Sequence, residues 1–121
     1  MKQHEAVKAY KALINLGQEK LPFDVAYALY QQKKELQDVF DFQVEQEKKL
    51  IEQYHASIDE KGFFHTENPD DMPLLQKDLA ELRECKTNKT IQPIEIKIPN
   101  DLKISMDELE PLLPIIKFVR E

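Results

Sequence analysis

A run of 44 residues without glycine, residues 18–61, is the feature that most limits how this chain can fold. Within it, no proline follows Pro22, so the two residues that most readily interrupt a helix are both missing from a long stretch. Pro22 itself suits the first turn of a helix, where its missing N–H group is not needed. The segment 22–55 therefore predicts one helix of about 33 residues, about 50 Å long.

Apolar residues in this segment recur in alternating steps of four and three, as on one face of a helix. Three of the eight positions hold glutamine, and a second apolar stripe lies beside the first. Such a broad face with a polar interruption favours an antiparallel helical hairpin or small bundle over a strict two-stranded coiled coil, although part of it could meet a second chain. The first stripe is Val25, Leu29, Gln32, Leu36, Val39, Gln43, Gln46 and Leu50, and the second is Ala26, Tyr30, Phe40, Val44, Ile51 and Tyr54.

Shorter helices are predicted on both sides of the long one. Residues 3–16 place apolar side chains on one helical face, and Gly17 supplies a C-terminal stop. A turn-rich break follows at 57–69. Residues 70–86 then predict a third helix, because leucines recur there at helical spacing and Cys85 continues the same stripe. We therefore expect Cys85 to be a core thiol rather than a nucleophile.

One short strand is predicted near the C-terminal end. Ile94, Ile96 and Ile98 alternate with charged residues, which is the period of a half-buried strand at 94–98. Because the backbone polar groups of a strand need partners, it must pair with something. The candidates are residues 62–66 or the same strand of a second subunit.

The last part of the sequence is strongly apolar. Ser105 and Glu108 fit the pattern of a helix N-terminal capping box. The apolar residues of 109–119 follow, interrupted by Pro111 and Pro114, so we expect a short, broken helical segment. A stretch this apolar is either buried on the domain or docked on a partner.

These patterns predict a mainly helical α+β fold. A chain of 121 residues suffices for one compact domain and not for two, so we expect a single domain over 1–121. Its expected parts are an N-terminal helical hairpin with a long arm at about 22–55, a third helix at about 70–86, a small β element at about 94–98 and a short C-terminal helical segment.

The composition argues against several kinds of active site. Two glycines cannot supply the Gly-rich loops that bind phosphates, and one cysteine excludes an internal disulfide or a multi-cysteine zinc site. His4, His55 and His65 do not pair at the helical spacings of metal ligands. The 23 acidic residues offer many pairs, and none is marked out for acid–base catalysis. We expect no enzyme activity, no catalytic residue, no metal and no cofactor.

The charge balance bears on partners and location. With 17 basic and 23 acidic residues the net charge is -6, and the longest basic clusters are the pairs Lys33-Lys34 and Lys48-Lys49, so we expect no direct binding to nucleic acid. No apolar stretch is long enough for a membrane span or a signal peptide, so we expect a cytoplasmic protein without membrane contact. The acidic balance also permits an acidic inhibitor or nucleic-acid mimic that blocks a basic groove of a host defence protein.

Candidate contact residues lie on the long helix and in the apolar tail. Tyrosine is enriched at interfaces, and an exposed apolar tail is a docking element. Alternatively, the tyrosines line the helical hairpin with their hydroxyls at the solvent edge, and the tail belongs to the core. The candidates are Tyr27, Tyr30, Tyr54, Leu112, Leu113, Ile116 and Phe118.

The order of segments also carries a resemblance. The segments are Leu21-Pro22, Tyr27, the helix end Lys48-Lys49-Leu50-Ile51-Glu52-Gln53-Tyr54, the turn Asp59-Glu60-Lys61-Gly62, the strand Ile94-Glu95-Ile96-Lys97-Ile98-Pro99, then Met106-Asp107-Glu108-Leu109 and Pro114-Ile115-Ile116-Lys117-Phe118. This layout resembles a family of small bacteriophage and prophage proteins, mainly of Gram-positive hosts. The resemblance implies a phage origin and a setting in the host cytoplasm or the virion, and it carries over no catalytic residue.

The leading functional hypothesis is a non-enzymatic protein–protein interaction module, a phage accessory, assembly or host-modulating factor. Its partner would be a phage or host protein, or a second copy of the chain. The acidic mimic is the alternative hypothesis.

Overall fold

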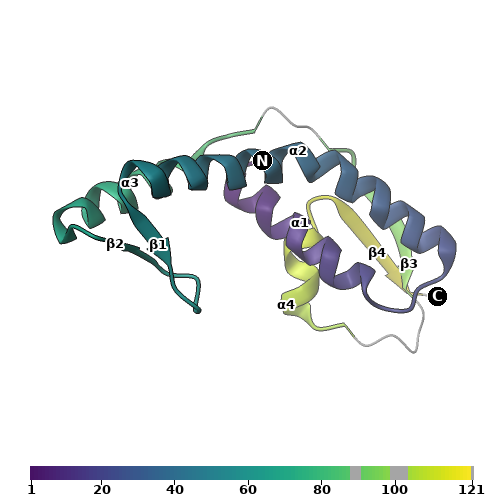
Figure 1. Cartoon of the computed structure of the whole chain (residues 1–121). Helices are drawn as coiled ribbons and strands as arrows, with labels where there is room; N and C mark the ends of the chain where they lie inside the picture. The colour runs from purple at the N-terminus through teal and green to yellow at the C-terminus, as the bar shows by residue number, and fades with distance from the viewer. Residues whose placement is uncertain (88–90, 99–103, 121) are drawn as a thin grey trace.

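The structure of the chain, a computed structural model, describes residues 1–87, 91–98 and 104–120 (Figure 1). It is mainly helical with a few short strands, as predicted, and its body is elongated along the longest helix. The elements in order are α1 (Gln3–Gly17), α2 (Phe23–Gln53), β1 (Ala56–Ile58), β2 (Phe64–Thr66), a 3₁₀ turn (Pro69–Asp71), α3 (Met72–Glu84), β3 (Ile94–Ile98), α4 (Met106–Leu109), a second 3₁₀ turn (Glu110–Leu112) and β4 (Ile116–Arg120).

The helix α2 is the predicted long helix, with 31 residues. Pro22 precedes it with a φ of -54°, near the helical value, so the chain enters the helix without strain. The helix ends before His55, whose φ of 48° lies in the left-handed region that interrupts a helix. Its buried residues are the first five positions of the first predicted stripe: Val25, Leu29, Gln32, Leu36 and Val39.

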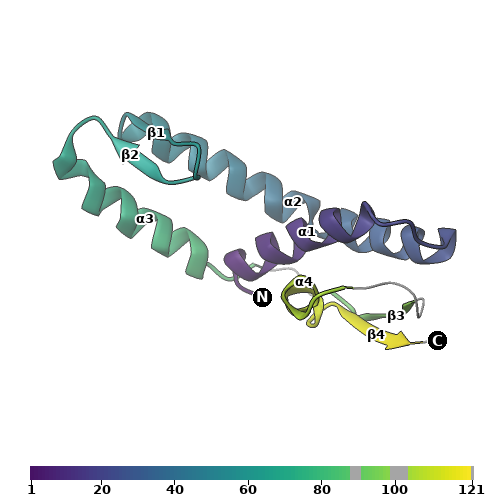
Figure 2. The same cartoon turned by 90° about the horizontal axis from the view of Figure 1, so that it is seen from below.

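The helix α1 packs antiparallel on the first half of α2 and completes the predicted hairpin (Figure 2). Its buried face includes Leu13, 2% exposed, and Tyr10, 6% exposed. The Tyr10 ring stacks on Phe40 with ring centroids 4.4 Å apart, and its hydroxyl donates to Gln37 Oε1 at 2.8 Å. The first half of α2 and α1 therefore share the main core of the molecule.

The second half of α2 extends past α1 and is covered by other elements. Figure 2 shows α3 lying alongside it. Leu75 and Leu79 of α3 are buried. Before α3, β1 and β2 form an antiparallel hairpin that pairs Ile58 with Phe64. Gly62 stands in the turn of this hairpin with a φ of 85°, a conformation that glycine adopts without a steric penalty. Residues 64–66, part of the segment offered as a partner for the 94–98 strand, therefore pair with the neighbouring strand β1.

The predicted strand 94–98 is confirmed, and the prediction that residues 62–66 pair with it is wrong. The strand β3 pairs with β4 in parallel, from Ile94 opposite Ile116 to Ile98 opposite Arg120. A parallel pair needs a crossover connection, and the short helical turns after β3 supply it. Within the described ranges, β3 and β4 form their own two-stranded sheet.

The predicted C-terminal helical segment at 109–119 is only partly correct. The α-helix stops at Leu109, one 3₁₀ turn follows, and the chain then becomes the strand β4. Pro111 and Pro114 remove the N–H groups that a longer helix would use, and the β-branched residues beyond them favour an extended chain. The Ser105 side chain caps the short helix through the N–H of Glu108, as the capping pattern predicts.

A buried glutamine joins the helical hairpin to the parallel sheet. Gln32 is 5% exposed, and its Nε2 donates to the carbonyl oxygens of Ile115 at 2.8 Å and Gln92 at 3.1 Å. The same Ile115 oxygen accepts the N–H of Ile94 at 3.1 Å. One side-chain amide in the apolar stripe of α2 therefore contacts the chain just before both strands, which explains the first of the three glutamines in that stripe.

Replacing this amide tests its role. We expect Gln32→Leu to lower the free energy of unfolding by about 1 to 3 kcal/mol, because two carbonyl groups in a largely buried region lose a donor. The neighbouring Gln31 is exposed, so Gln31→Leu is the matched control and should change stability by less than about 0.5 kcal/mol. Urea unfolding followed by circular dichroism measures both, and equal stability of the two variants would contradict the assigned role.

Candidate functional site

Three aromatic side chains at the start of α2 form an exposed face, here called the aromatic face. Phe23, Tyr27 and Tyr30 follow one another at steps of four and three, which places them on one side of the helix. Their exposed fractions are 94%, 63% and 49%. The opposite side of the same helix is buried against α1, so the aromatic face points away from the core.

A groove between α1 and α2 lies beside the aromatic face. It has a volume of about 240 Å³, and its lining includes Leu13, Ile14, Ala26 and Tyr30. Ile14, one of the apolar residues predicted to share a face of the first helix, is 38% exposed and borders this groove. Exposed apolar side chains next to a groove are typical of a protein-binding surface.

Two lysines lie next to Tyr30, the last residue of the aromatic face. The Lys33 and Lys34 ammonium groups lie 5.9 and 5.5 Å from the ring centroid of Tyr30, within the range of cation–π contacts. Such contacts are weak at an exposed site. Lys33 also lines the groove, so its ammonium group can pair with an acidic side chain of a partner.

The structure separates Tyr54 from the other two candidate tyrosines. Tyr54 stands at the far end of α2, where its hydroxyl donates to the Asp78 carboxylate of α3. This hydrogen bond, together with partial burial, raises the pKa of the Tyr54 hydroxyl. Tyr54 thus joins two helices, in agreement with the alternative that places tyrosine hydroxyls at the solvent edge of the packed helices.

The four tail candidates also divide between core and surface. Leu112 and Ile116 are 0% and 1% exposed, so they lie in the core and cannot touch a partner in this fold. Phe118 is partly buried against the same core, and Leu113 is 53% exposed. The tail is divided in this way because part of it forms the strand β4, and its buried residues join the core of the helical hairpin.

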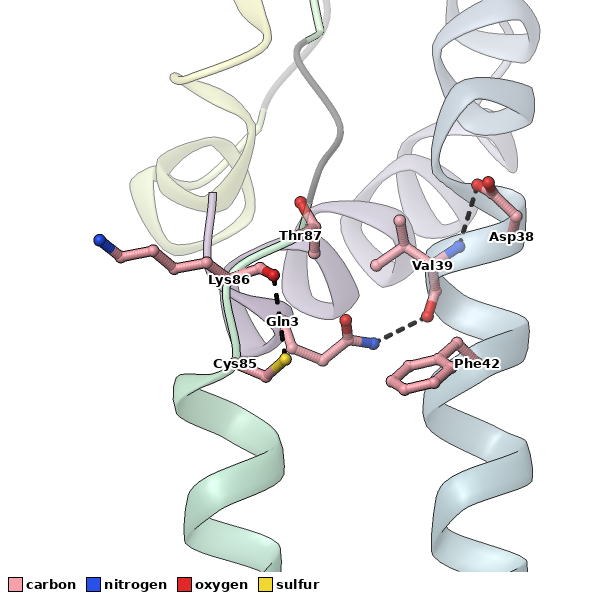
Figure 3. A pocket seen from close by; sticks show the side chains of 7 residues that line it. All are labelled: Gln3, Asp38, Val39, Phe42, Cys85, Lys86 and Thr87. Carbon is pink, nitrogen blue, oxygen red and sulfur yellow. Dashed lines mark hydrogen bonds between the residues drawn. The ribbon is translucent and has the colours of Figure 1, made fainter.

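The expectation that Cys85 is a core thiol is wrong. The helix α3 ends at Glu84, and Cys85 adopts an extended conformation with φ -61° and ψ 128°, so the helical spacing no longer applies to it. Its side chain is exposed. It borders a cleft of about 440 Å³, here called the Phe42 cleft, between α2 and the segment 85–87 (Figure 3).

The Phe42 cleft has one wall from each of two elements. Asp38, Val39 and Phe42 of α2 form one wall, and Cys85, Lys86 and Thr87 form the other. Their side chains lie around Gln3, which is 2% exposed and donates from Nε2 to the Val39 carbonyl oxygen at 2.8 Å.

Backbone pairing fixes the second wall of the cleft against the start of the chain. The N–H of Gln3 donates to the Cys85 carbonyl at 2.7 Å, and the N–H of Thr87 donates to the Met1 carbonyl at 2.9 Å. Lys2 and Lys86 thereby form an antiparallel bridge. Sequence patterns gave no sign of this contact because it joins residues more than 80 positions apart.

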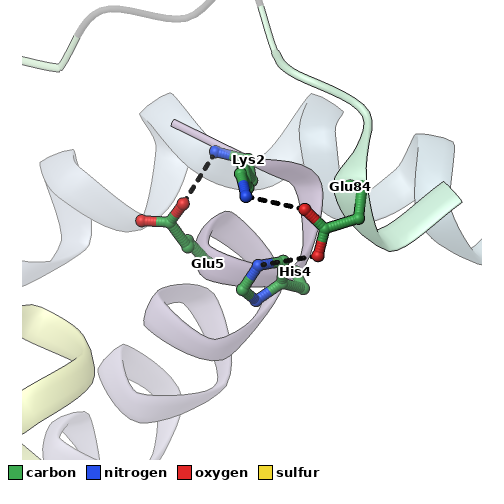
Figure 4. A network of polar contacts seen from close by, with 4 residues as sticks. All are labelled: Lys2, His4, Glu5 and Glu84. Carbon is green, nitrogen blue, oxygen red and sulfur yellow. Dashed lines mark hydrogen bonds and ion pairs between the residues drawn. The ribbon is translucent and has the colours of Figure 1, made fainter. Parts of the chain in front are cut away.

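An ion pair strengthens the same junction (Figure 4). The Lys2 ammonium donates to the Glu84 carboxylate at 2.6 Å, and the Lys2 N–H donates to Glu5. The His4 ring lies 3.9 Å from the other oxygen of Glu84. The hydrogen bond from Lys2 holds the pKa of Glu84 below its ordinary value and raises the pKa of Lys2.

The turn between β1 and β2 has a second, local polar network. Asp59 accepts hydrogen bonds from the N–H groups of Lys61 and Phe63 and lies 2.7 Å from the His65 ring nitrogen. The contact with His65 and these N–H groups lower the pKa of Asp59. These contacts stabilise the turn between β1 and β2. Within the described ranges, no group of three or more His, Cys, Asp or Glu side chains could hold a metal ion.

Comparisons with known proteins identify no relative. No family model matches the chain, and neither a curated protein nor a solved structure does. Over the described residues, no helix is long and apolar enough to cross a membrane.

Phe23 is the member of the aromatic face that sequence reasoning missed. It stands four residues before Tyr27 and seven before Tyr30, and that spacing was the available signal.

The neighbouring leucines of the tail test the division between core and surface. We expect Leu112→Ala to lower the free energy of unfolding by about 3 kcal/mol, because it leaves a cavity in the core. Leu113→Ala is the matched control and should cost less than about 0.5 kcal/mol. Thermal unfolding of both variants measures the difference. If Leu113→Ala were as damaging as Leu112→Ala, the placement of the tail would be wrong.

The ion pair of Figure 4 can be tested through the pKa of Glu84. We expect Lys2→Met to raise this pKa toward its ordinary value, as measured by NMR titration of the carboxyl carbon. A carboxyl group with a lowered pKa stabilises the fold above its unfolded-state pKa, and the effect is lost as the pH falls through the folded-state value. Lys8→Met, an exposed lysine of the same helix, should leave the pKa of Glu84 unchanged; a shift of equal size there would contradict the pairing.

Proposed function

We propose that this chain is a non-enzymatic protein-interaction module that binds an amphipathic helix of a partner protein at the aromatic face. The observation that carries the proposal is the exposure of Phe23, Tyr27 and Tyr30 on one side of α2, beside the groove lined by Ile14. A phenyl ring that is 94% exposed, like that of Phe23, contributes almost nothing to its own fold. Its burial against a partner would contribute to binding instead.

The shape of the surface supports a helix as the occupant. The antiparallel helices α1 and α2 present a groove between them, and a third helix can lie in such a groove with one apolar ridge. Lys33 and Lys34 lie next to Tyr30 of this surface, so the partner helix would carry acidic residues next to its apolar ridge. The partner is therefore defined by its chemistry as an acidic amphipathic helix.

The biological setting belongs to the same proposal. The resemblance to small phage and prophage proteins supports a phage accessory, assembly or host-modulating factor in the cytoplasm of a Gram-positive host. The partner would then be a phage or host protein. The proposal uses the N-terminal part of the tyrosine-bearing helix and no residue of the tail, since Leu112 and Ile116 are in the core and Phe118 packs against it.

Site-specific photo-crosslinking can find the partner and test the surface. A photoreactive phenylalanine replaces Tyr27 in one preparation and Phe63 in another, because both side chains are 63% exposed. Each preparation is irradiated in extract of a Gram-positive host. We expect a protein adduct at position 27 and none at position 63, since Phe63 lies in the distant hairpin turn.

The affinity between the identified protein and variants of this chain then tests the proposal. We expect Phe23→Ser and Tyr27→Ser each to weaken binding at least tenfold, about 1.4 kcal/mol, and Phe63→Ser to change it less than twofold. Calorimetry measures these affinities at two salt concentrations. Unchanged affinity of the two aromatic-face variants would refute the proposal, and an affinity that falls steeply with salt would favour the acidic mimic. A crosslink between two copies of the chain would show that the aromatic face binds a second copy instead of a partner helix.

A further inference from the structure

The strand β3 has an outer edge, meaning the side of the strand that faces away from β4. The N–H of Ile94 donates to the Ile115 carbonyl oxygen at 3.1 Å, so the backbone groups of Ile94 point toward β4. Backbone groups of successive residues in a strand point to opposite sides. The N–H and carbonyl groups of Glu95 and Lys97 therefore point to the outer edge. Within the described ranges, no strand pairs with that edge.

An open strand edge is a surface to which another chain can add a strand. Proteins usually protect such an edge, and a lysine on it is a common means. Lys97 is exposed, but a second exposed charge, the carboxylate of Glu95, lies two residues before it on the same face of the strand. The edge thus carries one charge of each sign, which permits pairing with a strand that carries the same two charges in reverse order.

The sequence of β3 is complementary to itself in this sense. It reads Ile-Glu-Ile-Lys-Ile from Ile94 to Ile98, so an antiparallel copy presents Lys97 to Glu95 and Glu95 to Lys97. We infer that the outer edge of β3 binds the same edge of a second copy of this chain, antiparallel and centred on Ile96. The product is a dimer with one four-stranded sheet in the order β4-β3-β3-β4. The inference uses neither the aromatic face nor the helix proposed to bind there, so the two can fail separately.

Charge selects this register among the three that pair Glu95 and Lys97 with each other or with themselves. In an antiparallel pair, two opposite residues whose backbone groups point toward the partner strand exchange two hydrogen bonds. Glu95 opposite Glu95, or Lys97 opposite Lys97, would place like charges together, which destabilises the pair of strands. Glu95 opposite Lys97 places opposite charges together, and the two-fold symmetry of the dimer repeats this pair.

Both charges are available for such pairs. Within the described ranges, no ion pair joins Glu95 or Lys97 to another side chain, although Lys117 of β4 stands opposite Glu95 in the parallel pair. Ion pairs at an exposed site contribute little free energy. The charges therefore set the register, while the backbone hydrogen bonds and the apolar contacts of the two strands supply most of the binding.

The isoleucines of β3 fit the same register. Ile96 and Ile98 are 4% and 6% exposed, and Ile94 packs partly against the core. In the centred register Ile96 lies opposite Ile96 of the second copy, and Ile94 lies opposite Ile98. The apolar side of the sheet, which the helical hairpin covers in each copy, then continues across the junction (Figure 2). Hydrogen bonds, charges and isoleucines thus favour one pairing, and they favour a second copy over an unrelated strand.

Analytical ultracentrifugation of the full chain over a concentration series tests the dimer. We expect Glu95→Lys and Lys97→Glu each to weaken dimerisation at least about tenfold, because two opposite-charge pairs become two like-charge pairs. The variant with both changes restores the pairs and should dimerise within about threefold of the unaltered chain. Glu19→Lys and Lys20→Glu make the same charge changes at exposed positions before α2 and should alter dimerisation less than about twofold.

Mixing the two single variants separates a specific pairing from a general effect of charge. Glu95→Lys leaves a lysine at both outer positions of its strand, and Lys97→Glu leaves a glutamate at both. One copy of each variant therefore forms the two opposite-charge pairs again. We expect heterodimers at least about tenfold tighter than the dimer of either variant alone. A mixture of Glu19→Lys and Lys20→Glu should show no such preference.

A zero-length crosslink locates the contact in the unaltered protein. Carbodiimide joins a carboxylate to an ammonium group with loss of water, and a mixture of unlabelled and isotope-labelled chain distinguishes links between copies from links within one. We expect mass spectrometry to find an amide bond between Glu95 of one copy and Lys97 of the other. Should a charge reversal unfold the chain, as circular dichroism would show, this crosslink decides alone.

Three results would overturn the inference. The first is a chain that stays monomeric up to about 1 mM, a concentration at which even weak specific pairing is detected. The second is a dimer that neither Glu95→Lys nor Lys97→Glu weakens. The third is a dimer that Phe23→Ser abolishes and Glu95→Lys leaves intact, which would place self-association at the aromatic face instead.

Discussion

The buried amide of Gln32 is the contact on which the arrangement of the molecule depends. It binds carbonyl oxygens 60 and 83 residues further along the chain, directly before the two strands of the parallel sheet. An apolar residue at that position could pack against the sheet but could not fix where its two strands begin. The hydrogen bonds make one geometry preferable to others, because each misplaced strand would leave a buried polar group without a partner.

The long helix α2 provides one frame for several separate parts. Its first half shares a core with α1 and the parallel sheet, and its second half carries α3 and the hairpin of β1 and β2. One side of its first two turns is left exposed, which is where the aromatic face lies. The Phe42 cleft lies where the first half passes into the second, because α1 begins there and α3 ends there.

Local patterns predicted the helices well and the long-range contacts poorly. Residues 22–55 contain all that a helix needs, namely good helix formers, a first-turn proline and no interruption, and the helix follows within two residues. The pairing of β3 with β4 depends on a crossover that no local period reveals, and the exposure of Cys85 depends on where α3 ends. The Gln3 contacts at the cleft join opposite ends of the chain. The candidate tyrosines could be predicted because residue type and position on a helix are local properties, whereas a cleft between distant segments is not.

The C-terminal position of Ile115 has a consequence for how the protein is made. Gln32 and the apolar stripe of α2 leave the ribosome long before Leu112, Ile115 and Ile116 are synthesised. At about 5–20 residues per second, the delay between Gln32 and Ile116 is about 4–17 seconds. During that time the hairpin of α1 and α2 exists without the sheet that covers it, so the nascent chain displays an uncovered apolar stripe with a free amide at its centre. Chaperones or a neighbouring nascent chain have their best opportunity to bind in this interval, and a slower-translated tail would lengthen it.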